Sequence, residues 1–293
     1  WRMSSDAPAP LRGMPEGIRL MGLSCGGEHC VAYTAEGQPF VWGSNEYGQL
    51  GLGDEDDRST PEPIELAEGA AVRSASCCAN VTILLMVDGH AWSCGETEHG
   101  VLGHAPPEPP PKGVGAGADD WFDNSVPECV SELQLVVVPR NAAGMLVQVS
   151  CAPQHAAALT SDGRVLTWGE AEGGRLGRKR RVSARGASPG SRAPSEQQAD
   201  SDNHARPSVV KFAIPDQNIV SLSAGGAHTL AVTSGGQLWL WGQISTHLSY
   251  TVPRLVLGPK LGHAFFLRVL AGDWVTLATA VPPPQDFDDE GED

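Results

Sequence analysis

The sequence has few basic residues, and this shortage limits the kinds of partner that it can bind. It carries 20 Lys and Arg against 35 Asp and Glu, which gives a formal net charge of −15 at pH 7. Nucleic-acid binding relies on clustered Lys and Arg that neutralise phosphates. The charge balance therefore argues against direct binding of DNA or RNA.

Long apolar runs and paired cysteines are also missing. No stretch approaches the roughly 18 apolar residues of a membrane-spanning helix, and residues 1–30 lack the apolar core of a secretory signal. The seven cysteines are an odd number, with no C-x-x-C pair and no His at zinc-finger spacing. We therefore expect a soluble protein of the cytoplasm, the nucleus or both, with reduced thiols, no metal, no cofactor and no membrane partner.

The common catalytic motifs are absent as well. The sequence has no P-loop, no G-x-S-x-G elbow and no H-E-x-x-H pair, and no two carboxylates stand apart from the many other acids. We expect no catalytic residues, and this favours a binding protein over an enzyme.

What the sequence does contain is a repeat. A Ser near the start of each copy and a later Gly are separated by 19 residues in all four copies, and a second Gly follows 8 residues later in three of them. A unit that cannot bury its own faces is stabilised by stacking on copies of itself. The copies are Ser24–Gly53, Ser76–Gly103, Ser150–Gly177 and Ser223–Gly242, and a degenerate fifth begins at Leu270 and contains Trp274.

Each copy contains two strand-like runs around a tight turn. The first run is apolar on both faces, which indicates a strand buried between sheets. In the second run large side chains alternate at period two, as they do on one face of a strand; we expect Trp42, Trp168 and Trp241 to be core residues. The turn dipeptides, where Gly supplies a positive φ, are Glu36-Gly37, Asp88-Gly89, Asp162-Gly163 and Gly235-Gly236.

Cysteine and histidine each recur at one position of the repeat. A small buried side chain explains the first position, and blade architecture rather than a catalytic trio explains the second, since successive units carry these residues to separate points. The residues are Cys25, Cys77, Cys151 and Ala224 at the first position, and His29, His155 and His228 at the second.

These motifs resemble the repeat of the regulator-of-chromosome-condensation family. The resemblance rests on the pattern SxGGxHxxAxTxxGxxxxWGxxxxGQLG, whose last segment is intact at Gly48–Gly51. Kelch blades are also Gly-rich, but their Gly pair ends a strand, whereas Gly26-Gly27 here leads into His29. The resemblance implies an all-β fold: a β-propeller of four-stranded antiparallel blades, with four recognisable blades and a partial fifth.

The repeat spacing also predicts the domain boundaries. The propeller is expected over residues 1–281, and an acidic tail over 282–293. We expect an arc of a longer propeller rather than a closed five-bladed ring, with parts of Val31 and Tyr33 open to solvent on the first blade. The expected blades are 20–66, 72–138, 147–213 and 219–257, with a partial blade from an inner strand within 268–281 and an outer one from 1–19.

Two insertions supply the candidate binding residues. The Pro-rich insertion 104–127 contains Trp121 and Phe122, which could anchor a protein partner or pack back onto the propeller. The insertion 178–207 opens with Arg178, Lys179, Arg180 and Arg181, a candidate nuclear-import run, and Ser183 is a candidate phosphorylation site; a solvated loop is the alternative. We expect both insertions to be mobile.

For function, the leading interpretation is a protein–protein interaction module. The resemblance implies two alternatives: guanine-nucleotide exchange on a Ran-type small GTPase, by preferential binding of the nucleotide-free form, and substrate recruitment within a larger ubiquitin ligase or kinase. Ultraviolet-B sensing on this fold uses a Trp cluster in G-W-R-H-T motifs, and the equivalent stretches here, at Gly27–Cys30 and Gly226–Thr229, contain no Trp.

Overall fold

The fold is described from a computed structural model of the 293-residue chain. It covers residues 12–104, 128–140, 142, 144–178, 204–213, 218–256, 264–272 and 276–281. Within these ranges no helix is both long and apolar enough to cross a membrane.

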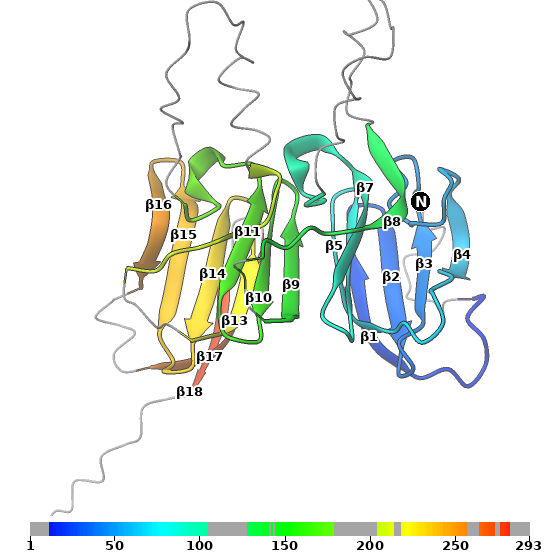
Figure 1. Cartoon of the computed structure of the whole chain (residues 1–293), viewed down its shortest axis with the longest axis horizontal. Coiled ribbons are helices and arrows are strands. Elements are labelled where there is room, and N and C mark those ends of the chain that lie inside the picture. The colour runs from blue at the N-terminus through cyan, green and yellow to red at the C-terminus, as the bar shows by residue number, and fades with distance from the viewer. Residues whose placement is uncertain are drawn as a thin grey trace, which may run out of the picture.

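The described residues form an all-β structure of four-stranded antiparallel sheets, which confirms the expected fold class (Figure 1). In each sheet the strands lie in chain order, so every strand pairs with its sequence neighbours. The first sheet is β1 (Leu20–Cys25), β2 (His29–Thr34), β3 (Pro39–Gly43) and β4 (Arg58–Pro63), and the second is β5 (Val72–Cys78), β6 (Val81–Met86), β7 (Ala91–Glu96) and β8 (Cys129–Leu135). The third is β9 (Leu146–Ala152), β10 (His155–Thr160), β11 (Val165–Gly169) and β12 (Ser208–Val209), and the fourth is β13 (Ile219–Ala224), β14 (His228–Thr233), β15 (Leu238–Ser245) and β16 (Leu248–Leu255).

The turn between the second and third strands of each blade has the geometry that its glycine predicts. Gly37, Gly89, Gly163 and Gly236 have φ values of +82°, +84°, +78° and +74°. In three blades a Thr hydroxyl closes the hairpin by accepting the backbone N–H four residues on: Thr34 from Gln38, Thr160 from Arg164 and Thr233 from Gln237. The turn therefore depends on a glycine for its backbone in all four blades and on a threonine for its closure in three of them.

Neighbouring blades pack face to face. This packing buries the apolar second strands of the second, third and fourth blades. Every residue of β6, β10 and β14 is buried. Trp168 and Trp241 are fully buried against the preceding blade, as expected. The expectation for Trp42 was wrong: this side chain is only half-buried, because no described blade covers its side of the first sheet.

The partial fifth blade differs from its expected form. It is a hairpin of two strands, β17 (Phe265–Ala271) and β18 (Thr276–Val281), rather than a single inner strand, and it packs on β13 and β14. The described part of the N-terminal segment, residues 12–19, contains no strand. Its Gly13 lies against Thr60 and Pro61 of β4, so this part adjoins the first blade and not the fifth.

The sheets pack on one another in chain order, from β1–β4 to the hairpin β17–β18. One end is β1–β4, where Leu23 is 63% exposed, and the other is β17–β18, where Leu270 is 64% exposed. Apolar side chains at both ends indicate an open arc in the described residues. The expectation that Val31 would be open to solvent was wrong: Val31 is fully buried, because it points toward the second blade, and the exposed face is the opposite one.

Candidate interaction face

The structure describes only one of the residues singled out from the insertions. Trp121, Phe122, Lys179–Arg181 and Ser183 lie outside the described residues. Arg178 lies between β11 and β12 of the third blade, where its Nη2 donates a hydrogen bond to the Thr167 carbonyl at 3.1 Å. Burial lowers the pKa of its guanidinium to about 10. The first residue of the basic run is thus attached to β11.

A serine joins each blade to the next. The Ser24 Oγ accepts the backbone N–H of Cys77 at 2.9 Å, across the gap between the first two sheets. The same bond repeats at every later interface: Ser76 with Cys151, Ser150 with Ala224 and Ser223 with Ala271, each at 3.0 Å. The serine that marks the start of each repeat therefore satisfies a backbone donor of the following blade.

The recurring histidine has a structural role. The Thr82 hydroxyl donates to the Gln49 carbonyl at 2.7 Å, so it accepts from Nε2 of His29, 2.9 Å away. His155 and Thr229 repeat this arrangement at the interface of the third and fourth blades, with an Nε2–Oγ1 distance of 2.8 Å and the Arg175 carbonyl as acceptor.

Burial keeps these imidazoles neutral. Desolvation lowers the pKa of His29 to about 4 and that of His155 to about 3. The two rings sit at different interfaces, and each bonds to one threonine of the next blade. They are therefore interface residues and not a catalytic pair.

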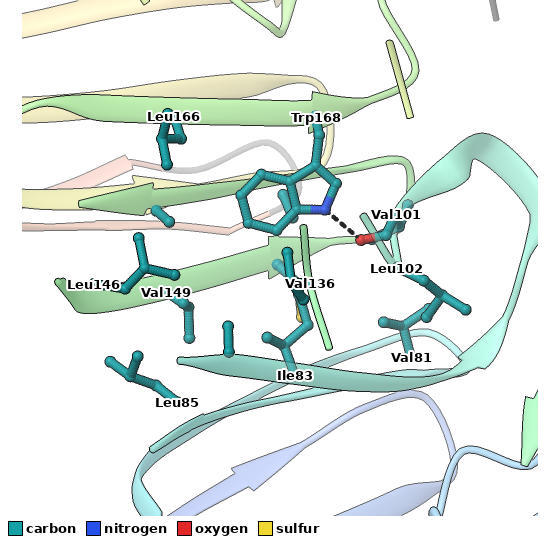
Figure 2. Close-up of a cluster of buried hydrophobic side chains, with 14 of the residues drawn as sticks. Val81, Ile83, Leu85, Val101, Leu102, Val136, Leu146, Val149, Leu166 and Trp168 are labelled. Carbon is teal, nitrogen blue, oxygen red and sulfur yellow. Dashed lines mark hydrogen bonds between the residues drawn. The ribbon is translucent and has the colours of Figure 1, made fainter. Parts of the chain in front are cut away.

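A glycine loop of one blade covers the tryptophan of the next. Figure 2 shows Trp168 donating from Nε1 to the Val101 carbonyl, at 2.6 Å, with Val136 beside the ring. Gly103 lies so close that a Cβ there would be 2.8 Å from the indole nitrogen. Gly177 approaches Trp241 in the same way, at 2.7 Å. The loop thus supplies a small residue against the ring, together with a carbonyl in the case of Trp168.

The first blade presents the same surface without such a cover. Strand register places six side chains on one face of the first blade: Leu23, Cys25, Cys30, Ala32, Phe40 and Trp42. Ala32 and Phe40 are buried there, and we name the other four, Leu23, Cys25, Cys30 and Trp42, the open face. Leu23 and Cys25 are exposed, and Cys30 and Trp42 are half-buried. Beside them lies a hollow of about 240 Å³ lined by Cys25–Cys30, Trp42 and Gly43.

The repeat pattern predicts burial for two residues of this face, Trp42 and Cys25. Trp42 shares the register of Trp168 and Trp241, which led to the expectation of burial. Cys25 shares the register of Cys151 and Ala224, but it is exposed, so a small buried residue is the wrong explanation at this copy. Both positions are covered by the preceding blade elsewhere, and the first copy has no described blade before it.

The open face is described by the side chains that it offers for contact. Across the described ranges, no group of three or more His, Cys, Asp and Glu residues is placed to hold a metal ion. The open face offers apolar surface, an indole and two thiols. Such a surface fits a polypeptide loop better than a small charged substrate.

Comparison of the sequence with models of protein families identifies the same repeat. Two models described as the regulator of chromosome condensation (RCC1) repeat match the chain, one over residues 36–85 and 162–232 and the other over 22–49, 146–174 and 219–246. Together these matches cover more than half of the chain.

Curated relatives are 26–29% identical to this chain over the aligned residues. The ultraviolet-B receptor UVR8 of Arabidopsis thaliana is 29% identical over 82% of this chain and 45% of its own length. The E3 ubiquitin-protein ligase HERC2 of Homo sapiens is 28% identical over 97% of this chain but 5% of its own length. Protein RCC2 of Homo sapiens is 26% identical over 84% and 44%. The chain spans less than half of each of these relatives.

Solved structures agree on the fold. Human WBSCR16 superposes with a TM-score of 0.65 at 19% identity, covering 92% of this chain and 60% of that one. Prp20p from Saccharomyces cerevisiae gives a TM-score of 0.65 at 19% identity, with 92% and 57% covered. From the repeat matches, the blade topology and these similarities, the chain belongs to the regulator of chromosome condensation (RCC1) repeat family of β-propellers.

Proposed function

We propose that this chain is a protein–protein interaction module, and that the open face of its first blade packs against a further polypeptide segment, either another blade or a partner. The partner surface that fits is a polypeptide loop with a glycine against the Trp42 ring and a carbonyl toward its Nε1. The observation that carries this proposal is the half-buried Trp42 beside a hollow. The equivalent Trp168 and Trp241 are fully buried under glycine loops of the preceding blades.

The described glycine loops of this chain already pack against its own blades. Gly51 lies 3.0 Å from Cys94 measured from an ideal Cβ, Gly103 covers Trp168, and Gly177 covers Trp241. The fourth blade has no such loop after Gly242, since β15 continues to Ser245 and turns directly into β16. Within the described ranges a second copy therefore has no free loop of this kind to offer, and this favours a different polypeptide segment as the occupant.

Site-specific crosslinking tests the proposal. A photoreactive phenylalanine at Leu23 on the open face is compared with one at Val220, which is 49% exposed on the fourth blade. We expect a protein adduct from Leu23 alone, and loss of binding of the purified adduct protein by the Trp42→Ala variant. Equal adducts from both positions, or unchanged binding by Trp42→Ala, would contradict this function.

Nucleotide exchange on a small GTPase is a second candidate function, and it can be tested alongside binding. The Prp20p structure is described together with binding of Gsp1p and histones, so a Ran-type GTPase and core histones are the first purified probes. Release of a fluorescent GDP analogue from the GTPase, measured with and without this chain, separates exchange from simple binding. Faster release would favour exchange, and binding without faster release would favour the interaction module.

A recruiting role within a longer protein is the third reading. Almost the whole chain aligns with a small part of a ubiquitin ligase, and 75% of it aligns with 20% of the serine/threonine-protein kinase Nek9 of Xenopus laevis. In such a protein the arc would bind the substrate while another domain reacts. The cytoplasm or nucleus is the compartment that we propose, because all seven cysteines are free thiols.

A further inference from the structure

The fourth strand of each blade is the outer edge of its sheet. Strands β4, β8, β12 and β16 each have one neighbouring strand in their sheet, so one edge of each faces away from it. An exposed edge presents unpaired N–H and C=O groups and pairs readily with other chains. Proteins protect such edges with prolines, with charges or by keeping the strand short.

One backbone hydrogen bond sets the same register for all four outer strands. The residue that follows the outer strand donates its N–H to the carbonyl of the first residue of the third strand, at 2.8–3.1 Å. These donors are Ile64, Val136, Val210 and Val256. The residues three positions before them are Pro61, Leu133, Pro207 and Pro253. Three blades therefore have proline at this position, and the second blade has leucine.

The first, third and fourth blades thus have protected outer edges. Proline has no N–H, so each of these edges lacks a donor at this position. In β4 a second proline, Pro63, removes a further donor two residues on. Strand β12 is also only two residues long, Ser208–Val209.

The edge of β8 has none of these protections. This strand is seven residues long and contains no proline, lysine or arginine. The counterpart of Pro63 is Leu135, whose side chain is 42% exposed. Because Val136 donates to Ala91 on β7, the N–H and C=O of Leu135 point away from β7. The second blade lies between two described blades, so this edge is not at an end of the arc.

The chain itself adds a strand to one part of this edge. Leu52 of the first blade forms an isolated antiparallel bridge with Glu132. Beside it, the Gly53 N–H donates to the Ser131 carbonyl at 2.9 Å. Among the described residues this pairing does not reach Leu135. The edge of β8 therefore accepts an antiparallel segment and is left unpaired at Leu135.

An apolar surface lies next to the unpaired residue. Trp92 pairs with Leu135, so both side chains lie on the same face of the sheet, together with Leu133. Trp92 is half-buried, whereas its counterparts Leu166 and Trp239 are fully buried. Trp92 and Leu133 pack at the margin of the core that the first and second blades share. A strand added at Leu135 would have this indole within reach of its side chains.

Negative charge surrounds the first half of β8. The Cys129 thiol donates to the Glu55 carboxylate at 3.3 Å, and Glu128 and Glu132 are exposed on the same stretch. Arg58, in the same loop as Glu55, is already paired with two acids of that loop and strand. A Lys or Arg complements such a surface. A second copy of the chain would bring the same carboxylates and a net charge of −15, which disfavours it as the occupant.

We propose that the outer edge of β8 around Leu135 binds an extended peptide of another protein as an additional antiparallel strand. The peptide has apolar residues at alternate positions, which contact Trp92 and Leu135. It has Lys or Arg toward its C-terminal end, which lies beside the first half of β8 in an antiparallel pairing. Backbone hydrogen bonds supply the affinity, and the alternate side chains supply the specificity.

Selection from a displayed peptide library tests the proposal on the 293-residue chain. The library alternates Thr with Val, Ile or Leu, and its members end either in Lys-Lys or in Glu-Glu. We expect enrichment of members that end in Lys-Lys. Binding of an enriched peptide is then measured by fluorescence anisotropy after methylation of alternate backbone nitrogens. One set of methylated positions should abolish binding and the other should not, because only every second N–H of a strand faces its partner.

The repeat supplies a matched pair of variants. Leu135→Pro copies Pro63 and removes the outward N–H, whereas Leu135→Val copies Val209 and keeps it. Both should fold, because this N–H does not pair with β7, and thermal unfolding checks it. We expect Leu135→Pro to weaken peptide binding by about tenfold and Leu135→Val to bind like the parent chain.

Four results would overturn the proposal: no enrichment, preference for the Glu-Glu members, equal loss with either set of methylated nitrogens, or unchanged binding by Leu135→Pro. The methylated peptides are measured on the parent chain, so they remain decisive even if Leu135→Pro does not fold. Trp42→Ala, on the open face, should bind the peptide like the parent. The proposed function and the β8 edge can therefore fail independently of each other.

Discussion

At the scale of single residues, Trp168 is a large buried contact between the second and third blades. It is fully buried and donates a hydrogen bond to Val101. We expect Trp168→Ala to lower the free energy of unfolding by about 3–5 kcal/mol, through lost burial and a cavity. Trp42→Ala is the matched control and should cost less, because that ring is only half-buried. Urea unfolding of both variants measures the difference, and equal losses would mean that the two tryptophans are equally enclosed.

The buried histidines predict a loss of stability on mild acidification. In the folded protein the pKa of His155 lies near 3 and that of His29 near 4, because burial disfavours the charged ring. In the unfolded chain both take the ordinary value of 6.5. Below that pH the unfolded chain binds more protons, so stability falls as the pH drops from 6.5 toward these folded values.

The size of this effect is measurable by urea unfolding between pH 7 and pH 4.5. Each fully buried histidine contributes at most roughly 1.4 kcal/mol per pH unit in this window. His155→Asn should be less stable at pH 7 but should show a shallower decline. The same slope in the variant would mean that His155 does not stay neutral in the fold.

At the scale of elements, the glycine loops connect one blade to the next. Gly103 has φ +73°, and an added Cβ would approach both Trp168 and Val136 within 3.0 Å. Gly17 has φ +80°, and a Cβ added there would meet no atom within 4 Å. Gly17→Ala therefore measures the cost of the backbone conformation alone. We expect Gly103→Ala to destabilise by about 1–3 kcal/mol more than Gly17→Ala, because only Gly103 adds steric overlap. Thermal and urea unfolding of the pair provide the measurement, and equal losses would exclude a tight contact.

The same elements show what the sequence could predict. Period and turn chemistry were enough for the strands and hairpins, because both signals are local: Gly37 and its counterparts need positive φ, and apolar runs on both faces need two covering sheets. The serine bridges and the His–Thr contacts were not predicted. Ser24 bonds to Cys77 and His29 to Thr82, 53 residues away in each case. Only the stacking of blades brings such residues together, so the sequence showed where they recur and not what they contact.

The candidate site was harder to predict for a similar reason. Trp42 and Cys25 look like their counterparts in the other copies, and local pattern alone gives them the same burial. Their exposure depends on which blade precedes them in space.

At the scale of the whole molecule, the arc exposes apolar side chains at both ends. Leu23 is 63% exposed on the first blade, and the paired Leu270 and Leu277 are 64% and 59% exposed on the last hairpin. Exposed apolar faces favour association, whereas the net charge of −15 opposes it. Added salt screens the repulsion and leaves the apolar contact.

We therefore expect this chain to self-associate with rising concentration, more strongly at high salt than at low salt. The double variant Leu23→Glu, Leu270→Glu should remain monomeric under conditions where the parent chain associates, because it places charge on both ends of the arc. Val220→Glu, at a site 49% exposed away from either end, adds a charge without altering these faces and should behave like the parent. Sedimentation velocity over a concentration series measures all three. If Val220→Glu suppresses association as strongly as the double variant, net charge rather than the open ends controls it, and if the parent chain is monomeric throughout, the two ends are covered in solution.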